Sequence, residues 1–549
     1  MSQTPSQQSL LQYNYERRNR CYKTKQSEIR TLSPRSETHY GNKLIKLTQN
    51  IFPCILRLMK KNINLPKNLG QGLTFDDILL VPNYSEVLPK NVITKTRLTR
   101  NINLHIPFIS APMDTVTESK MAIALAELGG IGIIHKNLSI ADQAREVERV
   151  KRYESGRIAN PITLPFDATV ADAFVLQKKY HFGGFPVVDK RGILMGIVTN
   201  RDLRFQKDES VPIKEIMTTE LITGNLRTRI EEANNLFNKH GIEKLPLVDK
   251  NNKLVGLITY RDIAKSKEYP NATKDSLGRL CVGAAVGTGS DVLLHVAELV
   301  KNNVDVVCIE TAHGHSKGVI DAVKRIRKVY PKLDIIAGNI ATSEAALALY
   351  KAGASAIKVG IGPGSICTTR IVSGVGVPQL SAVLSVYQVC KKLNIPVIAD
   401  GGIKHSGDVV KALAFGADVI MAGSMFAGTD EAPGDTIVIN DQKFKKYRGM
   451  GSLGAMQRGS KDRYFQGDEY DMTKLVPEGV SGHVSYKGAL AEVIHQYVGG
   501  LRAGMGYLGA PDISKLRNSS YYTITSAGLN ENHVHDIFMV SPAPNYKKQ

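Results

Sequence analysis

The sequence has no tryptophan, few cysteines and no long apolar run, and the last two features exclude whole classes of protein. None of the six cysteines belongs to a Cys-x-x-Cys pair, which argues against a zinc cluster and a disulfide framework. This cysteine content fits a reducing compartment, and we expect a cytoplasmic protein. No stretch approaches the ~20 apolar residues needed to span a bilayer. With 549 residues, the chain is long enough for a barrel of ~250 residues and a second domain.

Acidic residues are scarce near the N-terminus. The net charge is +20, and residues 1–67 hold 13 Lys and Arg against 3 Asp and Glu, which places half of the excess in this leader. Its polar, basic composition predicts a disordered segment rather than a nucleic-acid groove on a folded body. A transit peptide and a true start at Met59 are both open interpretations of residues 1–58.

Short apolar runs, separated by helical patterns, recur through the rest of the chain. Runs of this length suit strands buried on both faces of a parallel sheet, and eight strands alternating with helices predict an α/β fold, a (β/α)₈ barrel. A doubly wound open sheet is the alternative, because periodicity does not report closure. The runs cover residues 107–110, 131–135, 280–284, 304–309, 334–338, 356–360, 396–400 and 418–423.

A glycine-rich loop with one cysteine follows the sixth run. Its sequence is Gly360-Ile361-Gly362-Pro363-Gly364-Ser365-Ile366-Cys367-Thr368-Thr369-Arg370. Glycines allow close approach of a ligand, and successive amides can hold an anion. A thiol beside Arg370 and these amides can have a lowered pKa, and the thiolate is the nucleophile. A tight turn before a buried cysteine is the plainer alternative.

The loops after the seventh and eighth runs offer further ligand groups. These are Asp400-Gly401-Gly402 and Gly423-Ser424. Phosphate sites in such barrels often lie in these two loops, and Asp400 can accept hydrogen bonds from a ribose diol. All three loops would meet at one face, so the sequence predicts a nucleoside monophosphate held beside a nucleophilic thiol.

An internal repeat lies between the second and third runs, at residues 158–266. Phe185-Pro186-Val187-Val188-Asp189-Lys190 returns sixty positions later as Leu245-Pro246-Leu247-Val248-Asp249-Lys250. Such self-similarity marks repeated supersecondary units. The repeat resembles a tandem pair of CBS motifs, a module that binds adenine or guanine nucleotides. That resemblance implies nucleotide contacts from Thr199, Asp202, Thr259 and Asp262, although each Thr-x-x-Asp can also simply cap a helix.

Several longer segments resemble the inosine-5′-monophosphate dehydrogenase family, from about residue 68 almost to the C-terminus. They are Leu73 to Pro82, Ala111 to Val116, the cysteine loop, Asp400 to Gly402, Tyr447 to Ser452 and Glu478 to Gly482. The resemblance implies NAD-dependent oxidation of IMP to XMP in guanine nucleotide synthesis. The chain would then divide into a leader (1–67), a first barrel part (68–157), the CBS pair (158–266) and a second barrel part (267–549).

The same resemblance assigns roles to individual residues. Cys367 would form a covalent thioimidate with the substrate, and Arg463, on a closing flap with Tyr464, would accept the proton of the hydrolytic water; Thr369 joins this catalytic set. The IMP contacts would be Ser365, Asp400, Gly401, Gly402, Gly423, Ser424, Tyr447, Arg448, Gly449, Met450, Gly451 and Glu478. NAD would meet Glu310, Asn339, Gly360, Ile361 and Gly362, and Glu310 replaces the aspartate usual in the family.

The resemblance also implies a potassium ion and a homotetramer, with octamers an open question. Carbonyls of Gly362, Gly364 and Cys367 would bind the ion together with Glu531, Asn532 and His533 of a neighbouring subunit. Carbonyl oxygens around a large monovalent ion are physically reasonable.

Two rival functions stand beside this interpretation. A GMP reductase would share the barrel and cysteine loop, but usually lacks the CBS insertion and the Arg-Tyr flap. A nucleotide-sensing protein with an inactive barrel would explain the repeat and the basic leader, but not the intact set of Cys367, Arg463 and Asp400.

Overall fold

The structure is a computed structural model that describes residues 68–153, 158, 161–180, 183–464, 466, 467, 469, 471–537, 540, 545 and 546. The chain divides into two units, residues 1–71 and 72–549, and the second carries every feature described below. The predicted leader, residues 1–67, lies outside the described residues.

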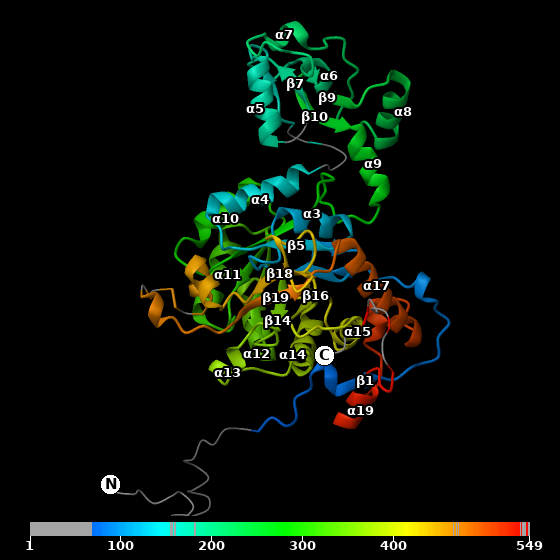
Figure 1. Ribbon diagram of the computed structural model, residues 1–549, viewed down its shortest axis with the longest axis vertical. Helices are drawn as coiled ribbons and strands as arrows, with labels where there is room; N and C mark the ends of the chain where they lie inside the picture. Colours follow the sequence, from blue (N-terminus) through cyan, green and yellow to red (C-terminus); the bar gives the residue numbers. More distant parts are fainter. Residues whose placement is uncertain are drawn as a thin grey trace, which may run out of the picture. The chain divides into compact units, whose positions relative to one another are not determined.

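Eight parallel strands close into a barrel (Figure 1). Closure is made where the last strand pairs with the first, from Ile420 opposite Phe108 to Ala422 opposite Ser110. The predicted (β/α)₈ barrel is confirmed, and the open sheet is excluded. The strands are β4 (Phe108–Ser110), β5 (Ile131–Ile134), β11 (Val282–Val286), β12 (Val306–Glu310), β13 (Asp334–Ile340), β14 (Ala356–Val359), β15 (Val397–Asp400) and β16 (Val419–Ala422).

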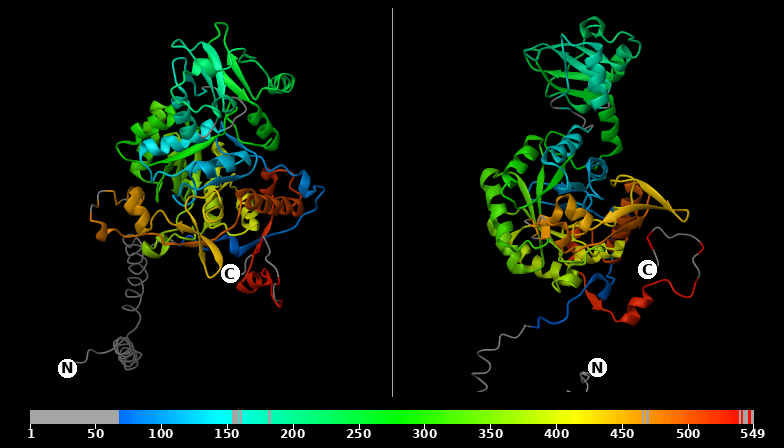
Figure 2. Two further views of the ribbon diagram at one scale, coloured as in Figure 1. Left: turned by 45° about the horizontal axis from the view of Figure 1, so that its top comes forward. Right: turned by 60° about the vertical axis from the view of Figure 1, so that its left-hand side comes forward.

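Helices alternate with these strands and surround them, as the turned views in Figure 2 show. Local signals set their ends: the Thr342 side chain accepts a hydrogen bond from the Ala345 amide at the start of α12, and Gly353 ends that helix with a φ of 109°. The principal helices are α3 (Ser119–Glu127), α4 (Ile140–Arg152), α10 (Val292–Lys301), α11 (Lys317–Val329), α12 (Ser343–Ala352), α14 (Gln379–Leu393), α15 (Ser406–Ala414) and α17 (Leu490–Tyr507).

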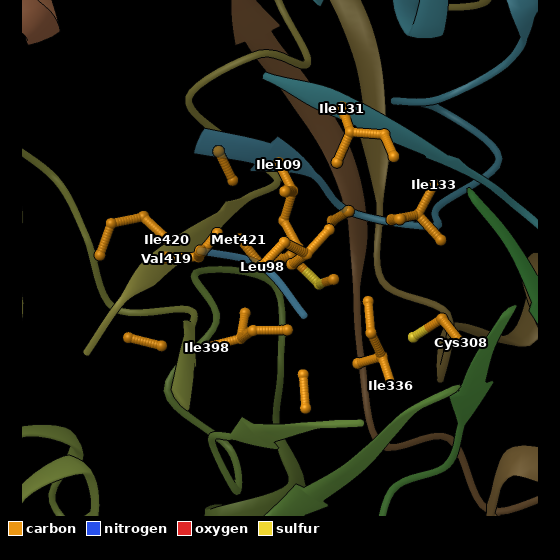
Figure 3. Close-up of a cluster of buried hydrophobic side chains, with 14 of the residues drawn as sticks. Leu98, Ile109, Ile131, Ile133, Cys308, Ile336, Ile398, Val419, Ile420 and Met421 are labelled. Atoms are coloured by element: carbon orange, nitrogen blue, oxygen red, sulfur yellow. The ribbon is translucent and has the colours of Figure 1, made fainter. Parts of the chain in front are cut away.

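The barrel strands are buried on both faces, which explains why their sequences are continuous apolar runs. Figure 3 shows side chains from different strands, among them Ile109, Ile131, Ile336 and Ile398, gathered in one cluster. Each such side chain contributes ~1.5–3 kcal/mol when fully buried. Lys358 on β14 breaks the pattern, because it is charged and completely buried.

The sequence repeat is also a repeat of structure. The hairpin of β7 (Gly184–Val188) and β8 (Leu194–Thr199) returns sixty residues later as β9 (Lys244–Val248) and β10 (Leu254–Thr259). The helices α5 (Val170–Tyr180) and α8 (Ile230–His240) keep the same offset, and each half has its own hydrophobic cluster. The domain boundaries at residues 158 and 266 stay a prediction.

A second group of strands lies outside the barrel. β17 (Thr436–Ile439), β18 (Gln442–Arg448) and β19 (Ser481–Ser485) form an antiparallel sheet, and β1 (Ile78–Leu80) pairs with β20 (Tyr521–Thr523). The remaining elements are η1 (Phe75–Asp77), η2 (Pro89–Asn91), β2 (Thr96–Arg97), β3 (Asn103–Leu104), β6 (Leu164–Pro165), α6 (Asn200–Leu203), α7 (Ile213–Ile216), α9 (Tyr260–Glu268), α13 (Thr369–Val372), α16 (Leu453–Ala455), η3 (Met456–Ser460), η4 (Lys461–Tyr464), η5 (Met472–Lys474), α18 (Ile513–Leu516) and α19 (Ser526–Glu531). None of the helices among the described residues has the length and hydrophobicity of a membrane-spanning segment.

Candidate active site

The cysteine loop leaves the end of β14 and depends on its glycines. A Cβ at Gly360 would come within 2.1 Å of the Asp400 carbonyl oxygen, and Gly362 has a φ of 77°. Both positions therefore require glycine. The loop carries Cys367 to a half-buried position, where its thiol donates to the Thr369 hydroxyl over 3.2 Å. Cys367 and Thr369, predicted as catalytic partners, thus touch each other.

Backbone hydrogen bonds fix this loop against a distant segment. The Thr368 amide donates to the Glu478 carbonyl, and the Val480 amide donates to the Ile366 carbonyl, each over 2.9 Å. The Glu478 amide in turn donates to the Gly451 carbonyl over 3.0 Å. Three segments that are far apart in sequence, all predicted to contact IMP, therefore meet at Cys367.

Arg370 has a structural role in the loop. Its Nε donates to the Ile361 carbonyl over 3.0 Å, and its Nη2 donates to the Val377 carbonyl over 2.6 Å. The prediction placed this guanidinium beside the thiol as an activating charge. In the structure it ties the start of the cysteine loop, at Ile361, to Val377 beyond the loop. Burial lowers the Arg370 pKa and Cys367 opposes that shift, so the guanidinium also lies near the thiol.

The loops after β15 and β16 lie at the same face as the cysteine loop. Gly401 and Gly402 have φ values of 90° and 83°, so only glycine turns the chain freely after Asp400. The Tyr447 hydroxyl lies close to Gly423, since a Cβ at Gly423 would be only 2.9 Å from it. The Tyr447 loop therefore lies at the end of β16. Burial raises the pKa of Tyr447, although a hydrogen bond with Ser365 opposes the shift.

One cavity unites most of the predicted residues. Its lining includes Cys367 and Thr369 with both flap residues, Arg463 and Tyr464. The predicted IMP residues that line it are Ser365, Asp400, Gly401, Gly402, Gly423, Ser424, Tyr447 and Met450, and the predicted NAD residues are Glu310, Asn339, Gly360 and Gly362. Ile361 instead packs into the barrel core.

Arg448, Gly449, Gly451 and Glu478 do not line the cavity. The Arg448 side chain is buried and pairs with the buried Asp114 through its Nε, 3.0 Å from Oδ1, and through Nη2. Burial acts to raise the Asp114 pKa, but hydrogen bonds from Arg448 and Asn137 outweigh it, and the pKa is lowered. Arg448 thus anchors the Tyr447 loop by its side chain, an arrangement that the sequence analysis missed.

A network of charges connects residues that line the cavity to the buried Lys358. Lys358 Nζ lies 2.7 Å from Glu310 Oε2 and 3.3 Å from Asp400 Oδ2, and it also contacts the Asn339 amide oxygen. Asn339 donates to Asp400 Oδ2 over 2.8 Å. Arg463 reaches the other oxygen of Glu310. Lys358 was missed at first because it sits inside an apolar run, and that unusual placement was the available signal.

Arg463 and Tyr464 belong to the segment between β18 and β19, and we call its described residues from 452 to 477 the flap. The Arg463 carbonyl accepts a hydrogen bond from the Ala312 amide over 3.1 Å, just beyond the end of β12. Tyr464 packs with Met456 and Leu475, and burial raises its pKa. The flap is therefore docked on the barrel with Arg463 at the cavity.

The predicted potassium residues fall into two groups. Gly362, Gly364 and Cys367 share the cysteine loop, and among the described residues no hydrogen bond reaches the carbonyls of Gly362 and Cys367. Free carbonyls of this kind suit a monovalent cation. Glu531, Asn532 and His533, at the end of α19, are not among the residues that line the Cys367 cavity.

The predicted CBS residues show the capping role. The Thr199 amide and hydroxyl both donate to Asp202 Oδ2, over 2.7 and 2.8 Å, at the start of α6. Thr259 ends β10 in the second copy, whereas the Asp262 side chain lies outside the described residues. Nucleotide binding by these residues stays a prediction.

Known proteins resemble this chain over most of its length. The family model described as "IMP dehydrogenase / GMP reductase domain" matches residues 72–535. The chain belongs to the IMP dehydrogenase / GMP reductase family. The inosine-5′-monophosphate dehydrogenase of Halalkalibacterium halodurans is 57% identical, covering 87% of this chain and 98% of that protein. The Bacillus subtilis enzyme of the same name is 54% identical, and the alignment again covers 87% of this chain and 98% of that protein.

A solved structure comes from the other branch of the family. A GMP reductase from Trypanosoma brucei, in complex with guanosine 5′-monophosphate, is 41% identical with a TM-score of 0.79. The alignment covers 86% of this chain and 99% of the reductase chain.

Proposed function

We propose that the protein oxidises IMP to XMP with NAD⁺, in two chemical halves that share the Cys367 cavity. In the first half, the Cys367 thiolate attacks purine C2, and hydride leaves that carbon for NAD⁺, which accepts it as a substrate. In the second half, water attacks the resulting thioimidate, XMP is released and the thiol is restored. The overall balance is IMP, NAD⁺ and water to XMP, NADH and a proton.

One observation carries this proposal. The nucleophile, the predicted nucleotide loops and Arg463 line a single cavity at the ends of the barrel strands. A phosphate at Gly423 and Ser424 and a ribose at Asp400 would place a purine base beside Cys367, because the three loops leave adjacent strands. Thr369 touches the thiol and can orient it.

The roles of the second half fall to the flap. Arg463 is the proposed proton acceptor for the hydrolytic water, and Tyr464 packs the flap against the barrel. An arginine base is unusual, because the solution pKa of a guanidinium lies far above neutrality. Arg463 can still accept the proton if it is held beside the hydrolytic water. Precedent in the family supports its assignment as the base.

Potassium is the proposed ion of the cysteine loop. The unused carbonyls of Gly362 and Cys367, with that of Gly364, are the residues of this chain that would hold it. Glu531, Asn532 and His533 would complete the site from a neighbouring subunit, which is a reason to expect a homotetramer. A bound ion would keep the loop ordered around Cys367.

The repeat at residues 158–266 is the proposed regulatory module. We infer that it binds purine nucleotides at Thr199, Asp202, Thr259 and Asp262. The capping bonds of Thr199 and Asp202 are compatible with this role, because polar residues at a helix start also suit phosphate. A cytoplasmic location is part of the same proposal.

GMP reductase activity is the second candidate, favoured by the Trypanosoma brucei structure. It would consume GMP and NADPH and release ammonia and IMP. The test is to follow nicotinamide absorbance with purified protein under two conditions, with potassium present in both. NADH formation from IMP and NAD⁺ supports the proposal; NADPH consumption with GMP, and none of the first reaction, would assign the reductase instead.

A further inference from the structure

The flap is tied to the barrel by an ion pair next to Arg463. Asp462 immediately precedes Arg463 on η4, and its carboxylate contacts the Nζ of Lys136. Lys136 comes from the loop that follows β5, and its side chain is only 8% exposed, whereas that of Asp462 is 41% exposed. Lys136 is thus the buried partner on the barrel, and Asp462 is the more exposed partner on the flap.

The loop that follows β11 has a glycine beside the Lys136–Asp462 pair. Gly287 follows β11, and a Cβ at that position would lie 2.7 Å from Asp462 Oδ2 and 3.7 Å from Lys136 Nζ. Any larger side chain would push the Asp462 carboxylate away. The loops that follow the neighbouring strands β5 and β11 therefore both contact the Asp462 side chain of the flap.

The loop after β5 also holds the start of the flap. Asn137 Nδ2 donates to the Ala455 carbonyl over 3.3 Å and to Asp114 Oδ2 over 3.0 Å. Asp114 in turn binds Arg448, which anchors the Tyr447 loop. Two successive residues, Lys136 and Asn137, therefore contact the flap at separate points.

We propose that Lys136 is a positioning residue for the hydrolytic half of the reaction. It docks the flap through Asp462 and thereby sets the fraction of enzyme in which Arg463 stands at the cavity. The proposal rests on the proposed function, because it assigns Arg463 to hydrolysis only. Lys136 does not line the cavity, so it acts through the flap and not on the substrate.

This role predicts a selective defect. Hydride transfer needs Cys367 and the bound substrates, but not the docked flap. Loss of the ion pair should therefore leave the first NADH burst intact and slow only the later turnover. A general loss of structure would reduce both, so the two phases separate a positioning role from a purely structural one.

The test combines single variants with a charge exchange. Lys136→Ala and Asp462→Ala should each lower steady turnover about 3- to 30-fold, the range expected for coupled neighbouring groups. The burst of NADH should keep its amplitude, and nucleotide should accumulate on Cys367. The double variant Lys136→Asp with Asp462→Lys should recover a large part of the lost turnover.

A conservative variant and a remote ion pair serve as controls. Lys136→Arg keeps the charge, and its turnover should stay within a few-fold of the parent value. If the double variant with exchanged charges fails to fold, the comparison of Lys136→Arg with Lys136→Ala tests the role of the charge instead. Lys301→Ala removes a lysine from the exposed pair with Glu298 on α10, where the two atoms lie 3.4 Å apart and the lysine is 75% exposed. Its turnover should not change.

Three results would overturn the proposal. They are unchanged turnover in Lys136→Ala, an equal loss of burst and turnover, or a Lys136→Arg variant as slow as Lys136→Ala. Failure of the proposed function gives a different result, because the unaltered protein would then form no NADH from IMP at all.

Discussion

The Lys358 ammonium lies 2.7 Å from the Glu310 carboxylate, fully inside the barrel. The same ammonium lies 3.3 Å from Asp400, which is proposed to bind the ribose of IMP. One buried cation thus serves two carboxylates, one on the proposed NAD side and one on the IMP side. Removal of this cation would leave both carboxylates close together without a shared partner.

Lys358→Met should therefore damage stability and both substrate sites. Breaking a buried ion pair by removing one partner costs ~3–5 kcal/mol. Denaturant unfolding measures this loss, and KM should rise for IMP and NAD⁺ together. Lys358→Arg is the matched control and should lose less of each. Unchanged stability in Lys358→Met would show that the two carboxylates do not need the cation.

Glu310 contacts a different cation with each carboxylate oxygen. Oε2 faces Lys358 and Oε1 faces Arg463. Glu310→Gln should weaken the second contact by removing the charge, so steady turnover should fall and the flap should dock less often. Limited proteolysis within the flap, compared between the variant and the parent enzyme, measures the docked fraction. Equal cleavage rates would contradict this role.

Glu310→Asp tests the length of the same side chain. Aspartate is one methylene shorter and cannot span both cations as glutamate does. We expect intermediate turnover and a changed KM for NAD⁺, since aspartate is the usual residue in the family. An Asp variant that matches the parent in both quantities would show that reach is unimportant at this position.

Asp114→Asn should reveal a pH-dependent contribution to stability. The lowered pKa of Asp114 means that its charged form is favoured in the folded state. That contribution is fully present above the unfolded pKa of ~3.9 and is lost as pH falls through the lower folded value. The difference in unfolding free energy between the parent and Asp114→Asn should therefore shrink below about pH 4. A constant difference down to pH 2 would contradict the assignment.

The inserted repeat should be dispensable for chemistry. Replacing residues 158–266 with a short linker should preserve turnover, because none of the residues described in this range lines the Cys367 cavity. Any response to ATP or GTP should disappear. Equal nucleotide responses in the full-length and shortened enzymes would rule out the module as the sensor.

The sequence predicted the barrel and most of the cavity because both depend on local patterns. Each of the eight strands is a short apolar run with a glycine or polar residue at its end, and the repeat has a fixed offset. The pairs Lys358–Glu310, Arg448–Asp114 and Lys136–Asp462 join residues far apart in the chain. The partners in such contacts leave no local signal, since a lone lysine or aspartate is usually an ordinary surface charge. Lys358 is the exception, because its place inside an apolar run is visible in the sequence, although its partners are not. Closure of the barrel was likewise invisible to periodicity.

The division of labour between Cys367 and Arg463 is tested most directly by rapid mixing with IMP and NAD⁺. Cys367→Ala should form no NADH and no adduct. Arg463→Ala should still release a burst of about one NADH per site, with steady turnover lowered by ~10²–10⁴, and should carry the nucleotide on Cys367 as a mass increase after denaturation. If Arg463→Ala loses the burst together with turnover, or Cys367→Ala still forms NADH, the proposed mechanism is wrong.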